Sequence, residues 1–305
     1  MNLGMWIAFI GNAEGGDPDR IVARCLSAGI KWLAVKSGDS DRNKAWSLAA
    51  QRLVKKAHDA GLKIYTWNYS VPGTWRRQIL QIESVFADGV DGHIVDAELE
   101  WETGGDHHAD AQAFVDALKI HFPDKWLAHA PFAWCSYHPS WPYAQFAKLN
   151  AVCPQAYWTE HDDHGALATC AQVDAEWAKM QGQPSFQPIG VTYGAGTGWG
   201  KPPGAFHGSD LLQFLAHYQK CDALSLYSME AAMPECWSTL EGLQTGLIKL
   251  PDPPLTMVQI QNKLGIKADG IRGPQTVAAI KSFQMAHNLV PDGIVGPLTE
   301  AALRN

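Results

Sequence analysis

Short apolar segments alternate with amphipathic segments along the first 248 residues of the chain. The apolar segments are rich in β-branched and aromatic residues, which is the pattern of buried strands. In the segments between them, apolar residues recur every three to four positions, as they do in a helix with one buried face. The predicted strands lie at 5–11, 31–37, 63–70, 93–99, 126–133, 151–158, 186–194 and 223–229.

The segments between these strands are predicted to be helices. Segment 17–29 starts with Asp-Pro and ends with Gly, which are typical cap residues. The other predicted helices lie at 45–61, 75–89, 109–122, 142–149, 166–182, 209–220 and 235–248. Repeated strand–helix units require parallel strands joined by right-handed crossovers. Eight such units predict an α/β fold, a closed (β/α)8 TIM barrel over residues 1–248, and an open doubly wound sheet is the alternative.

The remaining residues have a different pattern. Segment 249–255 holds three prolines in seven residues and is predicted to be a stiff linker. Residues 256–305 form a small helical unit with an internal repeat, ADGIRGPQT at 268–276 and PDGIVGPLT at 291–299. In each copy Asp-Gly predicts a turn and Gly-Pro predicts the start of a helix. A unit of this size has a small core, so we expect an accessory module of three helices.

Composition narrows the class of protein. Of the 305 residues, 46% are hydrophobic and 18% are charged, which is enough for a sizeable core and too little charge for a disordered chain. The net charge of −7 gives no reason to expect binding to nucleic acid or to an anionic membrane. The six cysteines form no CxxC pair. The N-terminal segment lacks the basic region of an export signal and is too short to span a membrane, so we expect synthesis in the cytoplasm.

An unusual row of acidic residues accompanies the fourth predicted strand. In HIVDAELEWE, every second residue from Asp96 to Glu102 is acidic. Side chains of a strand alternate between its faces, so these carboxylates are predicted to point the same way. Reactive groups of a barrel gather at the carboxyl ends of its strands. We therefore expect Asp96 just inside the barrel mouth and Glu98 at its rim, with Glu100 and Glu102 beyond the strand.

The C-terminal unit resembles the peptidoglycan-binding domain type 1 family. The resemblance rests on the pattern D-G-x-x-G-P-x-T-x-x-A-x-x-x-F-Q that starts at Asp269, and on its second copy from Asp292 to Thr299. It covers essentially the whole unit. It implies a three-helix fold that binds bacterial peptidoglycan.

The barrel carries a second resemblance. Segment 91–98 keeps the pattern D-G-x-x-x-D-x-E, which is similar to the fourth-strand signature of the GH18 chitinases and the GH25 lysozymes. These families usually carry one further Asp, at the place of Ile94 or in the first strand respectively, and this chain lacks both. The two parts together resemble a phage endolysin. This implies a wall-cutting enzyme that waits in the host cytoplasm until a holin opens the membrane.

These resemblances imply glycoside hydrolysis and suggest roles for the acids. The leaving oxygen needs a proton at neutral pH, so one carboxyl must keep its proton. We assign Glu98 as the general acid, and we expect the charge of Asp96 to raise the proton affinity of Glu98. Glu230 is the second candidate for a catalytic carboxylate. In related barrels the acetamido oxygen of the substrate can replace an enzyme nucleophile, and Asp96 is a candidate to orient that group.

Other residues near the predicted strand ends are candidates for substrate binding. We expect Tyr157 to hold the acetamido group, with Gln155 on the same face, and Trp158 to stack on a sugar ring. The remaining candidates are Tyr193, Tyr227, Trp67, Tyr69, Lys36 and His129. The segments GDHHAD (105–110) and EHDDH (160–164) lack the spacing of a zinc peptidase, so we predict polar loops, no metal and no cofactor.

The sequence therefore predicts a monomeric, metal-independent hydrolase of the peptidoglycan glycan backbone, most simply a muramidase. One alternative is an N-acetylglucosaminidase or chitinase-like enzyme. Another is a non-catalytic wall-binding protein, and a third is an amidase or peptidase. The last of these would need a metal or a nucleophilic Cys, and the sequence indicates neither; the absence of a GxSxG elbow leaves a serine hydrolase without support.

Overall fold

The structure of the chain is a computed structural model that describes residues 1–40, 46–160, 165–180, 182, 184–194 and 205–305. The described residues divide into two compact units, Met1–Leu250 and Pro251–Asn305. This division falls inside the segment predicted to be a linker. None of the helices in the described part of the chain is long and apolar enough to span a bilayer.

The first unit is built on parallel strands, as the alternating pattern predicted. The strands are β1 Leu3–Ile7, β2 Trp32–Asp39, β3 Lys63–Ser70, β4 Gly92–Ala97, β5 Trp126–Ala130, β6 Ala151–Val152, β7 Ser185–Phe186, β8 Ile189–Val191 and β9 Leu224–Tyr227. They pair in the order β7-β6-β5-β4-β3-β2-β1-β9-β8. The α/β TIM-barrel-like class is therefore confirmed.

The seventh predicted strand is interrupted, and the barrel closes at this interruption. β7 pairs with β6, whereas β8 pairs with β9, and Gln187 and Pro188 lie between β7 and β8. Ile189 forms a parallel bridge with Gln155 on one side and pairs with Ser225 on the other. β7 and β8 therefore share one position, and the strands make a closed ring.

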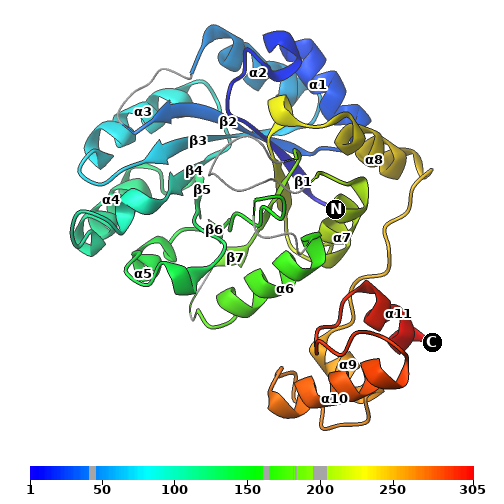
Figure 1. Cartoon of the computed structure of the whole chain (residues 1–305). Helices are drawn as coiled ribbons and strands as arrows, with labels where there is room; N and C mark the ends of the chain where they lie inside the picture. Colours follow the sequence, from blue (N-terminus) through cyan, green and yellow to red (C-terminus); the bar gives the residue numbers. More distant parts are fainter. Residues whose placement is uncertain (41–45, 161–164, 181, 183, 195–204) are drawn as a thin grey trace. The chain divides into compact units, whose positions relative to one another are not determined.

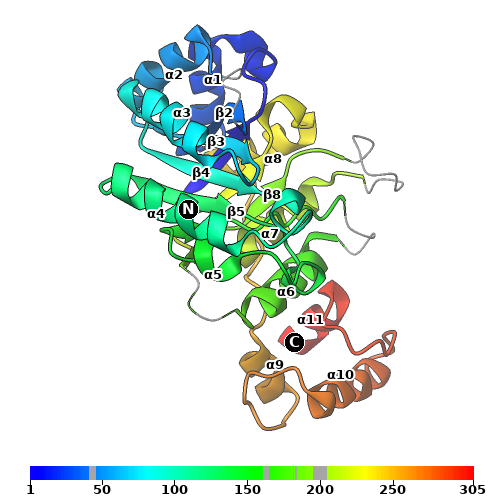
Figure 2. The ribbon, with the colours of Figure 1, turned by 90° about the vertical axis from the view of Figure 1, so that its left-hand side faces the viewer.

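Helices surround this ring (Figure 1), and the view in Figure 2 shows β2, β3 and β4 running side by side. The helices are α1 Pro18–Ser27, α2 Leu48–Asp59, α3 Trp75–Ala87, α4 His108–His121, α5 Tyr143–Phe146, α6 Gly165–Trp177, α7 Gly208–His217 and α8 Pro234–Thr245. Asp17 caps α1 by accepting a hydrogen bond from the Asp19 amide, and Pro18 occupies its first turn, as the cap residues predicted.

Aromatic rings fill the amino end of the barrel interior. Trp32 and Tyr65 have ring centroids 5.4 Å apart, and Tyr65 and Trp126 have centroids 4.8 Å apart. Two glycines make room for them. A Cβ atom on Gly4 would lie 2.1 Å from the Trp32 ring, and one on Gly92 would lie 2.9 Å from the Tyr65 ring. The close packing at this end therefore depends on positions without a side chain.

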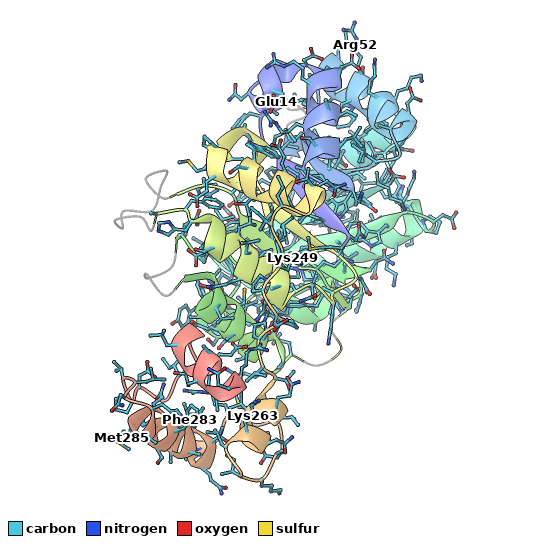
Figure 3. The ribbon with its side chains drawn as sticks, turned by 90° about the vertical axis from the view of Figure 1, so that its right-hand side faces the viewer. Glu14, Arg52, Lys249, Lys263, Phe283 and Met285 are labelled. Carbon is cyan, nitrogen blue, oxygen red and sulfur yellow. The ribbon has the colours of Figure 1, made fainter. Side chains whose placement is uncertain are left out.

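The second unit contains α9 Met257–Lys263, α10 Pro274–Ala286 and α11 Pro297–Arg304. Its core is formed by Ile260, Ile280 and Leu303. Lys263 on α9, and Phe283 and Met285 on α10, are labelled in Figure 3. The predicted repeat is confirmed, because α10 and α11 both begin at the proline of a Gly-Pro pair.

A buried glutamine organises each repeat of this unit. The Gln261 amide donates to Asp269, to the Ile271 carbonyl and to Thr276, and its oxygen accepts from the Gly270 amide. Gln284 makes the same four bonds to Asp292, Ile294, Thr299 and Gly293. Both glutamines are 1% exposed, so every polar atom must be paired inside the unit. The same buried glutamine therefore holds the Asp-Gly turn in place in both repeats.

Candidate functional site

Asp96 and Glu98 lie together at the carboxyl end of β4. Asp96 is the penultimate residue of the strand and is 8% exposed, whereas Glu98 follows the strand end. The side-chain amide of Gln155 donates to both, at 3.3 Å to Asp96 Oδ1 and 2.8 Å to Glu98 Oε1. The two carboxyls therefore face the same side of the barrel, with Asp96 the deeper of the two.

Burial favours the protonated form of this pair. It raises the pKa of Asp96 well above its ordinary value, and the charge of Glu98 raises it further, while Lys36 opposes both effects. Burial is also the largest cause of the raised pKa of Glu98, followed by the opposing bond from Gln155. We predicted that Asp96 acts on Glu98. The structure instead places the larger effect on Asp96, because Asp96 lies deeper. The pair therefore titrates as a unit that keeps a proton more readily than exposed carboxyls do.

Lys36 and Trp67 line the same interior beside this pair. They are partners in the register of β2 and β3, and the Lys36 ammonium lies 4.9 Å from the centroid of the Trp67 ring. Lys36 also pairs with Asp39 at 2.5 Å. The Trp67 indole donates to the Ile7 carbonyl at 3.1 Å, which fixes the ring. Lys36 thus supplies a positive charge next to buried acids.

Three tyrosines form another wall of the site. The Tyr157 and Tyr227 rings are stacked with centroids 5.8 Å apart, and Tyr193 meets Tyr227 edge-on at 6.5 Å. Burial raises the pKa of Tyr157 and Tyr227, and the charge of Asp96 raises both further. These hydroxyls therefore stay protonated and are available as hydrogen-bond donors.

Further carboxylates surround the pair. Glu100, in a 3-10 turn at Leu99–Trp101, accepts a hydrogen bond of 2.5 Å from Tyr69. Glu102 is bonded to His138 Nδ1 at 2.6 Å. Glu160 accepts a hydrogen bond from Tyr193, and its charge acts on Glu98. Sequence analysis left out His138 and treated Glu160 as part of a polar loop, because only the closed barrel brings them to the end of β4.

Two predicted binding residues lie elsewhere, and these predictions were wrong. Trp158 is 3% exposed and packs against Phe214 of α7, with ring centroids 5.3 Å apart. His129 is fully buried, and its ring centroid lies 5.6 Å from those of Trp141 and Phe146. It pairs with Val95, so strand alternation turns it away from Asp96. Both side chains belong to the layer between the strands and the helices.

Glu230 lies neither beside the Asp96–Glu98 pair nor in the layer between the strands and the helices. It lies in a 3-10 turn after β9, and its Oε1 accepts the amides of Ala8 and Phe9 at 2.9 and 3.1 Å. These bonds connect the end of β9 to the segment after β1. They favour a structural role, so the predicted catalytic role of Glu230 has no support in its contacts. Residues 161–164, which belong to one of the predicted polar segments, and residues 195–204 lie outside the described residues.

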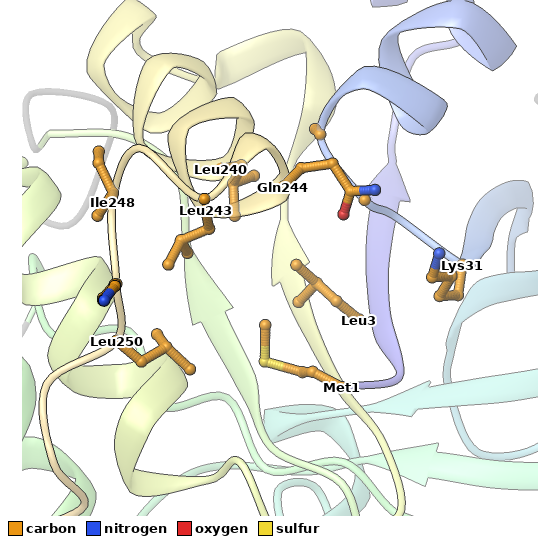
Figure 4. Close-up of a pocket in the computed structure, with 12 residues that line it drawn as sticks. Met1, Leu3, Lys31, Leu240, Leu243, Gln244, Ile248 and Leu250 are labelled. Atoms are coloured by element: carbon orange, nitrogen blue, oxygen red, sulfur yellow. The ribbon is translucent and has the colours of Figure 1, made fainter.

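A pocket of about 500 Å³ lies at the other end of the barrel (Figure 4). Its walls include Met1 and Leu3 at the start of β1, Lys31 before β2, and Leu240 and Leu243 of α8. The described residues that line it include lysines but no carboxylate. The pocket therefore offers no pair of carboxyl groups, and the acidic end of the barrel remains the candidate active site.

Comparisons with known proteins bear on both units. Residues 258–303 match the family model described as "Putative peptidoglycan binding domain". No curated protein matches the chain. Among solved structures, the chain is similar to a chitinase from Bacteroides thetaiotaomicron, with a TM-score of 0.59 and 9% identity over 81% of this chain and 98% of that one.

Two further structures show the range of proteins that share this fold. The GH18 chitinase ChiB of Flavobacterium johnsoniae has a TM-score of 0.56 and 14% identity over 81% of this chain and 94% of its own. A tamarind chitinase-like lectin has a TM-score of 0.50 and 10% identity over 78% and 98%. At these identities the likeness concerns the fold. The chain thus joins a chitinase-like barrel to a segment that matches a peptidoglycan-binding family.

Proposed function

We propose that the chain is a glycoside hydrolase that binds bacterial peptidoglycan and cuts its glycan backbone, with Glu98 as the general acid. The observation that carries this proposal is the Asp96–Glu98 pair, bridged by Gln155 at the carboxyl end of β4. A glycosidase needs a carboxyl that keeps its proton near neutral pH, and burial supplies that condition here. The C-terminal match supports the cell wall as the target.

In the proposed mechanism, the proton held by the Asp96–Glu98 pair is transferred to the glycosidic oxygen of the substrate. When substrate covers the site, water leaves and the neutral form of both carboxyls becomes still more favourable. Glu98, which lies nearer the mouth, donates its proton to the glycosidic oxygen as the bond to the anomeric carbon breaks. Asp96 and the tyrosine hydroxyls are placed to hold the polar groups of the sugar. Lys36 stabilises the negative charge left on the pair after proton transfer.

Two linkages of peptidoglycan are candidates for cleavage. A muramidase cuts after N-acetylmuramic acid and remains our first proposal. Cleavage after N-acetylglucosamine is the second candidate, and it is favoured by the similarity to proteins described as chitinases. To decide, fragments released from purified peptidoglycan are reduced with borohydride and analysed by mass spectrometry. Reduced N-acetylmuramic acid at the new end indicates the first linkage, and reduced N-acetylglucosamine the second.

A matched pair of variants tests the acid. We expect Glu98→Gln to abolish release of fragments while wall binding persists, because the amide cannot donate a proton as an acid does. Glu83→Gln is the control, because Glu83 is exposed on α3. Fragment release by Glu98→Gln at the rate of the control rules out the acid assignment. If the unmutated protein binds the wall without cleaving it, the result indicates a non-catalytic, lectin-like role instead. The tamarind structure, which is described as a lectin, shares this fold.

We also propose that the protein acts as a phage endolysin, held in the host cytoplasm until the membrane is opened. The combination of a glycosidase-like barrel with a wall-binding unit supports this role. Bacteria that express the chain in the cytoplasm should grow normally and lyse when chloroform permeabilises the membrane. Cells that express Glu98→Gln should remain intact under the same treatment. Lysis of both strains to the same extent would contradict the proposal.

A further inference from the structure

The two repeats of the C-terminal unit share one hydrogen-bond framework but differ in charge at two positions. When the repeats are aligned on their buried glutamines, Lys281 takes the place of Val258, and Arg272 stands where the second repeat has Val295. In both cases one repeat carries a cation where the other carries an apolar side chain. The four bonds of the glutamine form in both repeats, so the framework itself does not require either cation.

Both cations meet at the turn of the second repeat. Arg272 belongs to the turn of the first repeat, and its Nη2 donates to the Gly293 carbonyl at 2.8 Å. The stem of Lys281, on α10, passes over the same glycine, because a Cβ atom on Gly293 would lie 3.0 Å from Lys281 Cε. Both cationic side chains are exposed. Two cations from separate segments therefore lie beside one glycine, which leaves room for the lysine stem.

The acids of the unit are engaged elsewhere. Among its described residues, the salt bridges are those that Arg304 makes with Asp252 and Glu300. Asp269 and Asp292, the acids of the two turns, each accept a glutamine amide and a backbone amide of their own turn. Four cations in this part of the structure are therefore left without a salt bridge: Lys263, Lys267, Arg272 and Lys281.

Exposed isoleucines flank the cationic turn. Ile271 precedes Arg272 and is 67% exposed, and Ile294 follows Gly293 and is 54% exposed. Asp292 brings one carboxylate beside two cations, so the turn keeps a net positive charge. A forked cation, a second cation and apolar flanks together suit a peptide that carries a free carboxylate and small apolar side chains.

We propose that Arg272 and Lys281, beside Gly293, bind a free carboxylate of a peptidoglycan stem peptide. Stem peptides carry free carboxylates and alanine methyl groups, whereas the N-acetylated sugars of the glycan offer no free charge where a stem is attached. The remaining donors of Arg272 can form the two parallel bonds that a carboxylate accepts, and Lys281 adds a point charge.

This proposal rests on the proposed binding of peptidoglycan and names the part of the polymer that the C-terminal unit recognises. The two units then divide the polymer between them. The barrel acts on the glycan, and the C-terminal unit holds the peptide. Glycan strands without stem peptides are therefore expected to be poor ligands of the C-terminal unit.

Chemical modification of the wall gives the first test. The full-length Glu98→Gln protein, chosen to prevent cleavage during the assay, is sedimented with purified peptidoglycan that is free of teichoic acid. A second sample of the peptidoglycan has its carboxyl groups converted to methylamides with carbodiimide. We expect the modified wall to bind about tenfold more weakly or worse, because an amide offers no negative charge to Arg272.

The outcomes of this test separate the inference from the proposed function. Equal binding to both walls overturns the inference and leaves the binding of peptidoglycan standing. If the protein does not bind the untreated wall, the proposed wall binding fails and the inference falls with it.

Variants of the cationic turn, made in the same full-length protein, give the second test. We expect Arg272→Gln to weaken binding to the untreated wall about tenfold, and Lys281→Gln about threefold. Arg272→Lys should keep only part of the affinity, because lysine lacks the planar fork. On the modified wall, Arg272→Gln should cause no further loss, because the partner of Arg272 has been removed. An equal loss on both walls overturns the inference.

Lys263→Gln is the matched control. It removes one cation of the same unit that has no salt bridge, and Lys263 ends α9 and belongs to neither turn. We expect its binding to stay within about twofold of the unmodified turn at the same salt concentration. A loss as large as that of Arg272→Gln would indicate general charge attraction and overturn the inference.

Thermal melting checks that each variant folds, because Arg272→Gln also loses the bond to the Gly293 carbonyl. Lys281→Gln keeps that bond, so it tests the site even if Arg272→Gln is unfolded. In that case, equal binding by Lys281→Gln and Lys263→Gln overturns the inference.

Discussion

The two ends of the barrel interior use the same strands for opposite purposes. At the amino end, inward positions of β2 and β3 hold Trp32 and Tyr65, which pack ring against ring. Toward the carboxyl end, inward positions of the same strands hold Lys36, which lies near Asp96 at the end of β4, and Tyr69, which donates to Glu100 after β4. The stability of the amino end therefore depends on the volume of its packed side chains, whereas the carboxyl end depends on the charge and protonation of its acids. We expect substitutions that add volume to be costly at the amino end, and substitutions that change charge to be costly at the carboxyl end.

The largest effect is expected from a methyl group at the amino end. In Gly4→Ala the new Cβ would lie 2.1 Å from the buried Trp32 ring, far inside contact distance. Overpacking a core costs about 1–3 kcal/mol, and because the Trp32 ring is buried we expect the upper end of this range, which urea unfolding measures. Gly11→Ala is the control, because its Cβ meets nothing within 4 Å. Equal stabilities of the two variants would show that the amino end is not tightly packed.

At the carboxyl end, Asp96→Asn should affect activity and stability in opposite directions. We expect kcat to fall about 10²-fold, because the asparagine amide cannot ionise or share a proton with Glu98 as the Asp96 carboxyl does. The folded-state pKa of Asp96 is raised, so its ionisation destabilises the fold as pH rises above the unfolded value. The variant should therefore melt higher than wild type at pH 8. A lower melting temperature at that pH would contradict the burial argument.

The pH dependence of activity should reflect the shared proton of the same pair. Because the pKa values of Asp96 and Glu98 are both raised, the alkaline limb should lie above the range of an ordinary glutamate, about pH 4.3. Lys36 lowers the pKa of Asp96. In Lys36→Met this limb should move to still higher pH, and a shift to lower pH in the kcat profile would contradict this assignment.

The smallest effect is expected outside the barrel interior. Both ring nitrogens of His129 lack a hydrogen-bond partner among the described residues. His129→Phe should therefore leave activity unchanged and alter stability at pH 7.5 by about 1 kcal/mol or less. Burial lowers the pKa of His129 to about 3, so wild type loses stability as pH falls below the unfolded value, and the variant should lose less over the same range. Loss of activity in His129→Phe at neutral pH would contradict this prediction and show that His129 contributes to the active site.

Most of the fold followed from local patterns. The run at 63–70 became β3 with the predicted bounds, and the Gly-Pro pairs begin α10 and α11 as expected. The later strands were less predictable. The run at 151–158 keeps only β6 and a bridge at Gln155, because backbone turns after Pro154 end the alternation. Trp158 was therefore assigned to the wrong side.

The candidate site was predictable only in part, for a similar reason. Asp96 and Glu98 follow one another on one strand, so their common face could be inferred from alternation. Gln155 was placed correctly near them, but its role as a bridge between the two acids needed the structure. Glu160 and His138 carry no local pattern that separates them from ordinary loop residues.

By itself, the sequence determined the parallel barrel, the repeated turns of the C-terminal unit and the acidic end of β4. These features depend on strand and helix periods and on the backbone preferences of glycine and proline, all of which act over a few residues. Only the tertiary structure decided which side chains meet across the barrel mouth. Gln155 is 59 positions from Asp96 in the chain, and the two meet because β5 joins β4 to β6, while the bridge from Gln155 to Ile189 of β8 holds the residues after β6 in the ring. Ring closure sets the distances between strand ends, and those distances decide which acids can share a proton.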